Sequence, residues 1–316
     1  MKIVHTASFW PESAHDSVMV LGNFDGMHKG HQAVIGRARD IARAQNLPLA
    51  MMTFEPHPRR FFQPELPMLR IVPFAEKARL LRDAGVEYLY VARFNAQFSK
   101  LSAEEFIGAI LRETLHVAHV VTGHDFAFGN KRSGDGDTLN SYAKTYNYEY
   151  TQVPAVTMDG ANAYSSTAIR QALAEGRMKD AAAILGRLYS IKGIIIHGDK
   201  RGRSIGFPTA NIRPAPLYRP RYGVYAVRLH LGEKDYDAVA NFGFRPTLDG
   251  QRCVLEVHAI DAEFDAYGHS ARVEFLEFIR AEKKFSGVEA LVAQISNDVE
   301  AAKAIHATHT PIVEVL

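Results

Sequence analysis

The chain has 316 residues, with 37 lysines and arginines against 35 aspartates and glutamates, so its formal net charge is +2 at neutral pH. That balance excludes a general positive field for holding nucleic acid by its phosphates, and any phosphate recognition is expected to be local. The single cysteine excludes an internal disulfide and a cysteine-cluster metal site, and no apolar run is long enough to span a bilayer. We therefore expect a cytoplasmic protein of about two domains, with neither a nucleic-acid nor a membrane partner.

Short apolar strands alternate with amphipathic helices from residue 17 to about residue 186. A strand over residues 17–22, a helix over 31–45 and a strand over 47–54 form a first βαβ unit. Further strands are expected at residues 86–94, 117–123 and 148–156, and further helices at 75–85, 102–115, 138–147, 166–176 and 178–186. The alternation predicts a doubly wound, Rossmann-like parallel sheet with ligands at the carboxyl ends of its strands.

The pattern changes after Leu188 to strand-like runs without intervening helices. These runs occupy residues 189–199, 223–231, 236–244, 253–260 and 271–280. They predict an antiparallel barrel or sandwich, and the apolar spacing of residues 287–307 predicts a closing helix that packs against it. We place the domain boundary near residues 186 to 189, which gives domains 1–186 and 187–316.

The sequence LGNFDGMHKGHQ lies at the first strand-to-helix turn, where phosphates meet backbone amides and a helix N-terminus in such sheets. Gly22 and Gly26 allow the backbone to approach an anion closely. His28 and His31 lie one helical turn apart, and Gly30 removes a side chain that could block their common face. Both histidines could donate hydrogen bonds to one phosphate and stabilise charge that builds up there. Taken without context, the pair would more often be a capping residue and a solvated helix residue.

In context, Gly22 to His31 resembles the signature of the HxGH nucleotidyltransferases, which in one branch is G-x-F-D-x-x-H-x-G-H. The resemblance implies that His28 and His31 contact the phosphates of ATP as pyrophosphate leaves. It also implies a second signature at SSTAIR, where Arg170 reaches a phosphate from the start of a helix, although a surface arginine is the simpler interpretation. The implied nucleotide contacts are Gly22, Asn23, Phe24, Asp25, Gly26, Gly30, Ser165, Ser166 and Thr167. The implied flavin contacts are His57, Asp125, Phe126 and Phe128, of which His57 could equally be a polar loop residue.

A second glycine-rich stretch, HGDKRGRSIGFPTANI, opens the second half. Its composition alone fits a basic surface loop. The part GRSIGFPTANI, however, resembles the PTAN motif of riboflavin kinases, which implies that Thr209 and Asn211 hold Mg²⁺ and the phosphates of ATP. The implied nucleotide contacts are Gly198, Gly202, Arg203, Gly206, Phe207, Pro208 and Thr209, and the implied flavin contacts are Asn241 and Arg245.

Glu256 lies in a predicted strand, where it shares one face with Val254 and His258, opposite Leu255 and Val257. A carboxylate on a strand is more often a solvated residue of an outer face. The resemblance to riboflavin kinases instead implies that Glu256 is the general base, which takes a proton from the 5′-hydroxyl of riboflavin.

Both sets of motifs occur in the order found in bifunctional bacterial riboflavin kinase/FAD synthetases, over residues 1 to about 305. The resemblance implies a nucleotidyltransferase domain followed by a six-stranded antiparallel barrel with a C-terminal helix. It also implies ATP with Mg²⁺, with riboflavin, FMN and FAD as substrates and products rather than permanent cofactors, and a monomer or weak homo-oligomer. Two alternatives remain open: an FMN-binding regulator without turnover, and an adenylyltransferase for another small phosphate.

Overall fold

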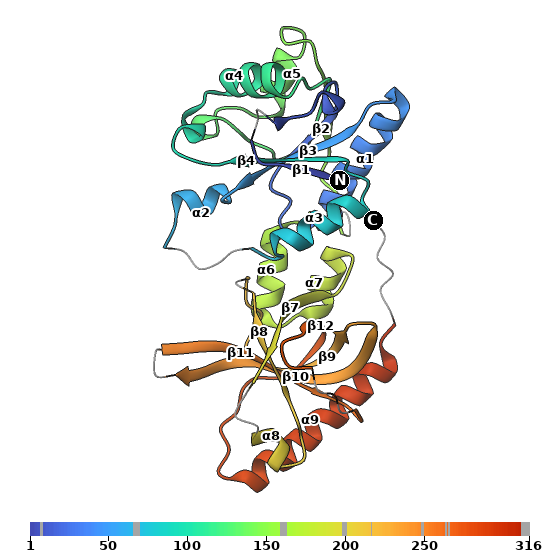
Figure 1. The fold of residues 1–316 in the computed structure, drawn as a ribbon, viewed down its shortest axis with the longest axis vertical. Coiled ribbons are helices and arrows are strands. Elements are labelled where there is room, and N and C mark those ends of the chain that lie inside the picture. Colours follow the sequence, from blue (N-terminus) through green and yellow to red (C-terminus); the bar gives the residue numbers. More distant parts are fainter. Residues whose placement is uncertain are drawn as a thin grey trace. The chain divides into compact units, whose positions relative to one another are not determined.

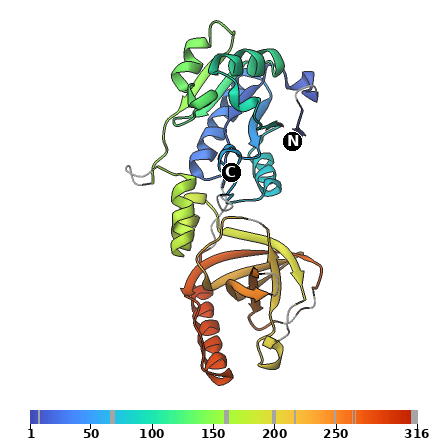
Figure 2. The same cartoon turned by 90° about the vertical axis from the view of Figure 1, so that its left-hand side faces the viewer.

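The computed structural model describes residues 1–6, 9–65, 70–158, 163–197, 201–215, 217–247, 250–262, 264 and 266–310, without the side chains of residues 201, 203, 245–247 and 250–252. The chain divides into two compact units, residues 1–165 and residues 166–315, here called the sheet unit and the barrel unit (Figures 1 and 2).

The sheet unit contains a six-stranded parallel sheet with the strand order β1-β4-β3-β2-β5-β6. Its strands are β1 (Lys2–Val4), β2 (Val18–Leu21), β3 (Leu49–Glu55), β4 (Tyr88–Arg93), β5 (His119–Gly123) and β6 (Glu149–Val153). Its helices are η2 (Glu12–Ala14), α1 (Lys29–Gln45), α2 (Pro58–Phe62), α3 (Phe74–Asp83), η3 (Phe98–Lys100), α4 (Ala103–Glu105), the π-helix η4 (Phe106–Thr114), η5 (Asn130–Arg132) and α5 (Gly136–Tyr142). The predicted doubly wound parallel sheet is confirmed.

Helices cover both faces of this sheet, which is why β2 and β3 read as continuous apolar runs. Successive β2 residues alternate between two cores: Val18 packs in one cluster with α1 and α3, and Met19 packs in the other with η4 and α5. The edge strand β1 and the short helix α2 were not expected from the sequence. β1 has three residues, pairs with β4 alone, and is too short to show a period.

The barrel unit begins with α6 (Ser166–Glu175) and α7 (Met178–Leu185), which contact each other. The closed antiparallel barrel follows, with the strand order β10-β11-β8-β7-β12-β9. Its strands are β7 (Tyr189–Ile196), β8 (Ala210–Pro214), β9 (Gly223–Leu231), β10 (Lys234–Thr247), β11 (Gly250–Ala259) and β12 (Ser270–Arg280), with helices α8 (Arg201–Ser204) and α9 (Val288–Thr308). The predicted six-stranded barrel and its closing helix are confirmed.

Both faces of several barrel strands are apolar, for two different reasons. Tyr225, Phe242 and Leu255 are at most 1% exposed and fill the barrel interior. On the outer surface, Val224 and Val239 are buried because α9 packs over them (Figures 1 and 2). α9 therefore closes part of the outer surface of the barrel, and its residues also line a cavity there.

Helices α6 and α7 lie in the sequence between the last strand of the sheet and the first strand of the barrel. α7 contacts β7 and β12, and the Nζ atom of Lys179 lies 2.8 Å from Oε2 of Glu277 on β12. These contacts group α6 and α7 with the barrel. The domain boundary near residues 186 to 189 stays a prediction, because α6 and α7 precede the first barrel strand in the chain but group with the barrel by their contacts.

Candidate active sites

The loop of residues 22–27 connects β2 to α1 at the carboxyl edge of the sheet. Four of its residues have left-handed backbone conformations, with φ of +156° at Gly22, +50° at Phe24, +85° at Gly26 and +48° at Met27. Such a conformation costs a residue with a side chain about 1–2 kcal/mol and persists only where its surroundings fix it. Strained loops of this kind are common at ligand sites, and the predicted nucleotide contacts Gly22 to Gly26 all lie here.

The two histidines of the motif lie directly after this loop. His28 caps α1, because its Nδ1 atom accepts a hydrogen bond from the backbone N–H of His31 at 3.3 Å. The two imidazole rings stack with their centroids 3.5 Å apart, and His28 is buried. His28 is thus the capping residue of the simpler interpretation, yet the structure also brings both rings together at a helix N-terminus, as binding to one phosphate requires.

The structure shows why position 30 of the motif is a glycine. A Cβ atom on Gly30 would lie 3.1 Å from Nδ1 of His28 and 3.4 Å from the carbonyl oxygen of Tyr164. The ring of Tyr164 also lies under the ammonium of Lys29, at 5.7 Å. A side chain at position 30 would therefore push on the His28 ring and on the segment that leads to Ser165.

The second signature starts a helix, as predicted. Ser166 is the first residue of α6, and Arg170 lies one turn further on and is half-buried, while Thr167 is exposed. Ser165 is half-buried in the segment before the helix. The contacts of these residues with a phosphate stay predictions.

Two further predicted contacts of the sheet unit have structural hydrogen bonds. Asp25 is buried, and its Oδ1 atom accepts a hydrogen bond from the backbone N–H of Ile71 at 2.9 Å. His57 caps α2 by accepting from the backbone N–H of Arg59 at 3.2 Å. Asp25 thus ties the 22–27 loop to the segment before α3, and His57 orients the short helix after β3.

Aromatic rings gather near the carboxyl ends of β3 and β4. Of the predicted flavin contacts, Asp125 is exposed, while Phe126 and Phe128 stack with their centroids 5.7 Å apart. The rings of Phe106 and Phe128 are in contact. The same chain of ring contacts includes Phe54, Phe61, Phe62, Phe94 and Phe98. These five residues were not predicted from the sequence, although the adjacent phenylalanines of RRFF were a signal, and Phe62 is 63% exposed.

The strand register of the barrel brings the residues of the second site into one row. Asn211 on β8 pairs with Glu256 on β11, Glu256 pairs with Asn241 on β10, and Asn241 pairs with Val224 on β9. Residues directly opposite each other on neighbouring strands share a face. These side chains therefore lie together on the outer surface of the barrel, beside α9.

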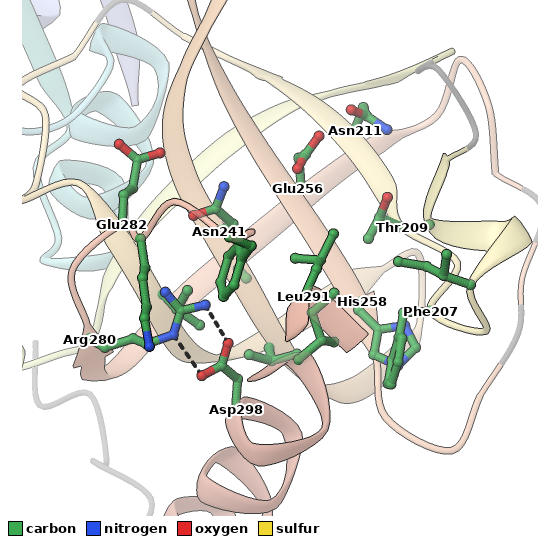
Figure 3. A pocket seen from close by; sticks show the side chains of 18 residues that line it. Phe207, Thr209, Asn211, Asn241, Glu256, His258, Arg280, Glu282, Leu291 and Asp298 are labelled. Atoms are coloured by element: carbon green, nitrogen blue, oxygen red, sulfur yellow. Dashed lines mark hydrogen bonds and ion pairs between the residues drawn. The ribbon is translucent and has the colours of Figure 1, made fainter. Parts of the chain in front are cut away.

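This row forms one wall of a cavity of about 320 Å³ (Figure 3). Its polar lining includes Thr209, Asn211, Asn241 and Glu256, and Figure 3 shows the Glu256 carboxylate beside the Asn211 side chain. Glu256 is thus half-buried in the wall of a cavity on the outer surface of the barrel. Leu255 and Val257, its chain neighbours, are fully buried in the interior, as the strand alternation predicts.

A compact turn presents the PTAN segment to the cavity. The backbone N–H of Phe207 donates to the carbonyl oxygen of Gly202 at 2.8 Å, and a Cβ atom on Gly202 would lie 2.3 Å from the Phe207 carbonyl oxygen. Gly206 has a φ of +87°, which favours glycine. The segment is also fastened to β11, because Nδ1 of His258 donates to the carbonyl oxygen of Pro208 at 2.8 Å. Gly202, Phe207 and Thr209 line the cavity.

Three predicted ligand contacts of the barrel unit fall outside the described residues or side chains. Gly198 lies outside the described residues, and the side chains of Arg203 and Arg245 are not described. Their roles stay predictions.

The wall of the cavity that α9 provides was not predicted from the sequence. Arg280, the last residue of β12, donates from Nε and Nη2 to the two carboxylate oxygens of Asp298 at 2.8 and 2.7 Å (Figure 3). Asp298 is 4% exposed and also accepts from the side chain of Gln294 at 3.0 Å. Leu291 and Ile295 of α9 complete this wall. The signal in the sequence was an aspartate within the apolar stripe of the closing helix.

The sheet unit carries the motif that resembles the HxGH nucleotidyltransferases at the end of a parallel strand, and the barrel unit carries the segment that resembles the PTAN motif of riboflavin kinases beside a cavity. The family model for FAD synthetase matches residues 10–168, and the model for riboflavin kinase matches residues 185–306. The chain therefore belongs to the family of bifunctional riboflavin kinase/FMN adenylyltransferases.

Two sequence relatives and one solved structure support this family membership. The chain is 40% identical over 296 residues to the bifunctional riboflavin kinase/FMN adenylyltransferase of Escherichia coli K12, covering 93% of this chain and 94% of that one. It is 41% identical over 295 residues to the enzyme of the same name from Listeria monocytogenes, covering 92% and 93%. A crystal structure described as a macrolide-efflux protein from Streptococcus pneumoniae has 36% identity and a TM-score of 0.87, covering 95% of this chain and 98% of that chain. Within the described residues, none of the helices combines the length and apolar character needed to cross a membrane.

Proposed function

We propose that this chain makes FAD from riboflavin in two steps, each with its own ATP. The barrel unit phosphorylates riboflavin to FMN, releasing ADP, and the sheet unit joins FMN to the AMP part of a second ATP, releasing pyrophosphate. The observation that carries the proposal is the row Asn211, Glu256 and Asn241 on one cavity wall, in the same chain as the stacked His28 and His31.

In the barrel unit, Glu256 is the general base. Its carboxylate takes the proton of the riboflavin 5′-hydroxyl as that oxygen bonds to the γ-phosphorus of ATP, and the bond from this phosphorus to the leaving ADP breaks. The residue lies in the wall of a cavity and can therefore face a bound hydroxyl. Asn241, its neighbour in the row, is placed to orient the flavin.

Thr209 and Asn211 fit an Mg²⁺ ion, because a hydroxyl and a carboxamide provide the neutral oxygen atoms that this hard cation accepts beside phosphate oxygens. Both line the cavity next to Glu256. When bound with ATP, Mg²⁺ neutralises phosphate charge. The barrel contributes the positions of these oxygen atoms, and the Gly202 turn and the bond from His258 to Pro208 keep them in place.

In the sheet unit, a phosphate oxygen of FMN attacks the α-phosphorus of ATP in line, and the bond to the bridging oxygen of pyrophosphate breaks. No covalent enzyme intermediate is needed. His28 and His31 stabilise the charge that builds up on the leaving phosphates, and the N-terminal end of α1 adds positive potential. The phosphate contact of Arg170 stays a prediction, because α6 groups with the barrel unit.

The flavin contacts of the sheet unit are assigned from the chemistry of the isoalloxazine ring. The isoalloxazine ring is flat and aromatic, and Phe62, which is 63% exposed, offers it a stacking surface. His57 and Asp125 are the polar contacts in the sheet unit, and flavins pass through as substrate and product. A monomer or weak homo-oligomer in the cytoplasm stays our expectation.

A turnover assay tests the proposal. The purified chain is incubated with riboflavin, ATP and Mg²⁺, and the flavins are separated by chromatography. We expect FMN followed by FAD, and FAD and pyrophosphate from FMN alone with ATP and Mg²⁺. Flavin that binds without being converted would favour the regulator, and pyrophosphate release that requires an acceptor other than FMN would favour a different adenylyltransferase.

A further inference from the structure

Lys77 is a buried ammonium at the carboxyl edge of the sheet. It lies on α3 between Phe74 and Leu81 on the apolar side of that helix, and it is 7% exposed. Lysine is almost never fully buried unless it is paired, so a lysine in the apolar stripe of a helix calls for an explanation. The motifs of the sequence do not include it.

The Lys77 ammonium joins the ends of two neighbouring strands. Its Nζ atom donates to the carbonyl oxygen of Asn23, in the loop after β2, at 3.2 Å, and to Oγ1 of Thr53 on β3 at 2.9 Å. Oγ1 of Thr53 in turn lies 3.4 Å from the same Asn23 oxygen. Oε1 of Glu55 lies 3.9 Å from Nζ and provides the opposite charge.

These bonds act on the strained 22–27 loop. Asn23 stands between Gly22 and Phe24, both with positive φ. The loop has a second anchor at Asp25, which accepts from the backbone of Ile71. Because left-handed residues relax unless they are held, the two anchors together keep the loop in the shape that leads into the His28 cap.

We propose that Lys77 is a positioning residue for adenylyl transfer: through the Asn23 carbonyl, its ammonium holds the 22–27 loop in the shape that presents His28 and the loop amides to the phosphates of ATP. Lys77 acts through the loop and needs no contact with substrate. The inference rests on the assignment of adenylyl transfer to the sheet unit.

The charge of Lys77 is sensitive to pH. Burial lowers its pKa to about 8, while the carboxylates of Glu55 and Asp25 act in the opposite direction and the Arg70 guanidinium acts in the same direction as burial. Above that pH the ammonium becomes a neutral amine, which donates a weaker hydrogen bond and loses its attraction to Glu55. FAD formation should therefore decline above about pH 8 for a reason that the barrel unit does not share.

The test uses the full chain with Lys77→Met, Lys77→Arg and Lys144→Met, the last an exposed lysine of the sheet unit. FAD formation from FMN and FMN formation from riboflavin are measured from pH 6.5 to 9.5. We expect wild-type FAD formation to fall with an apparent pKa near 8, and Lys77→Arg to move this fall to higher pH. Lys77→Met should lose at least tenfold in kcat, while FMN formation and Lys144→Met stay within twofold of wild type.

Hydrogen exchange of the backbone amides of residues 22–27 provides a measurement that does not depend on turnover. Exchange should be faster in Lys77→Met and unchanged in Lys144→Met. An unchanged pH profile in Lys77→Arg, or unchanged exchange in Lys77→Met, would overturn the role of Lys77. If wild-type chain formed no FAD, the assignment of adenylyl transfer would fail, and the exchange experiment would still decide whether Lys77 anchors the loop. If Lys77→Met did not fold, the shifted profile of Lys77→Arg would decide.

Discussion

The ion pair between Arg280 and Asp298 is a buried polar link between the barrel and the part of α9 that closes the kinase cavity. Replacing Asp298 with alanine removes two charge-assisted hydrogen bonds, each worth about 1.5–3 kcal/mol. It also leaves the Arg280 guanidinium, whose side chain is 21% exposed, without this partner. Breaking a buried pair from one side typically costs about 3–5 kcal/mol. Because Arg280 keeps some contact with water and a bond to the Ala281 carbonyl oxygen, we expect the lower end, about 3 kcal/mol.

Denaturant unfolding can assign this loss to one unit. Trp10, the single tryptophan, is buried in the sheet unit, where its indole N–H donates to the carbonyl oxygen of Leu115 at 3.2 Å. Tryptophan fluorescence therefore reports on the sheet unit, and far-ultraviolet circular dichroism reports on both. We expect Asp298→Ala to move only the dichroism transition, and to raise the KM for riboflavin more than it lowers kcat.

The matched control is Glu277→Ala, which breaks the Lys179–Glu277 pair, whose side chains are 74% and 36% exposed. An exposed pair contributes at most about 1 kcal/mol, so this variant should resemble the wild type. Equal stability losses in the two variants, or a loss below about 0.5 kcal/mol for Asp298→Ala, would refute the view that a buried pair fixes α9.

Three further predictions use single substitutions. Gly30→Ala should lower FAD formation by about tenfold, because the new Cβ would crowd His28, while Gly36→Ala, which meets nothing within 4 Å, should leave both activities intact. Asn211→Ala should raise the Mg²⁺ concentration needed for half-maximal FMN formation, measured by titration, without changing that for FAD formation. Lys77 has a folded-state pKa of about 8 against 10.5 for an exposed lysine, so folding releases a proton between these pH values and stability rises with pH. The wild type should thus gain about 3 kcal/mol in unfolding free energy relative to Lys77→Met between pH 7 and about 11; a difference that stays constant with pH would contradict this.

Much of the fold could be predicted because its strands follow simple rules. The continuous apolar runs of β2 and β3 indicate a parallel sheet that is buried on both faces, and the series of strands after Leu188 indicates an antiparallel barrel. β1 was missed because three residues are too few to show a period. The face of Glu256 could be predicted from strand alternation, whereas its place in a cavity wall depends on the register with Asn211 and Asn241.

The proximity of candidate site residues was predictable where these residues stand close together in the sequence. The glycines and histidines of residues 22–31 stand together in the chain, and the structure brings His28 and His31 together. Lys77 and Asp298 could not be found in this way, because each completes a site from a helix far away in the chain. In both helices the signal was a polar residue within an apolar stripe. Such a pattern indicates a buried polar group, but it does not show which partner that group contacts.

The central claim is that two separate sites act in turn on one flavin. It is tested most directly by measuring FMN and FAD formation in Glu256→Gln and in His28→Ala/His31→Ala, each supplied separately with riboflavin and with FMN. We expect Glu256→Gln to lose FMN formation by roughly 10²–10⁴-fold while still converting FMN to FAD, and the double variant to do the reverse. Loss of both reactions in either folded variant would show that one site serves both steps and would contradict the account.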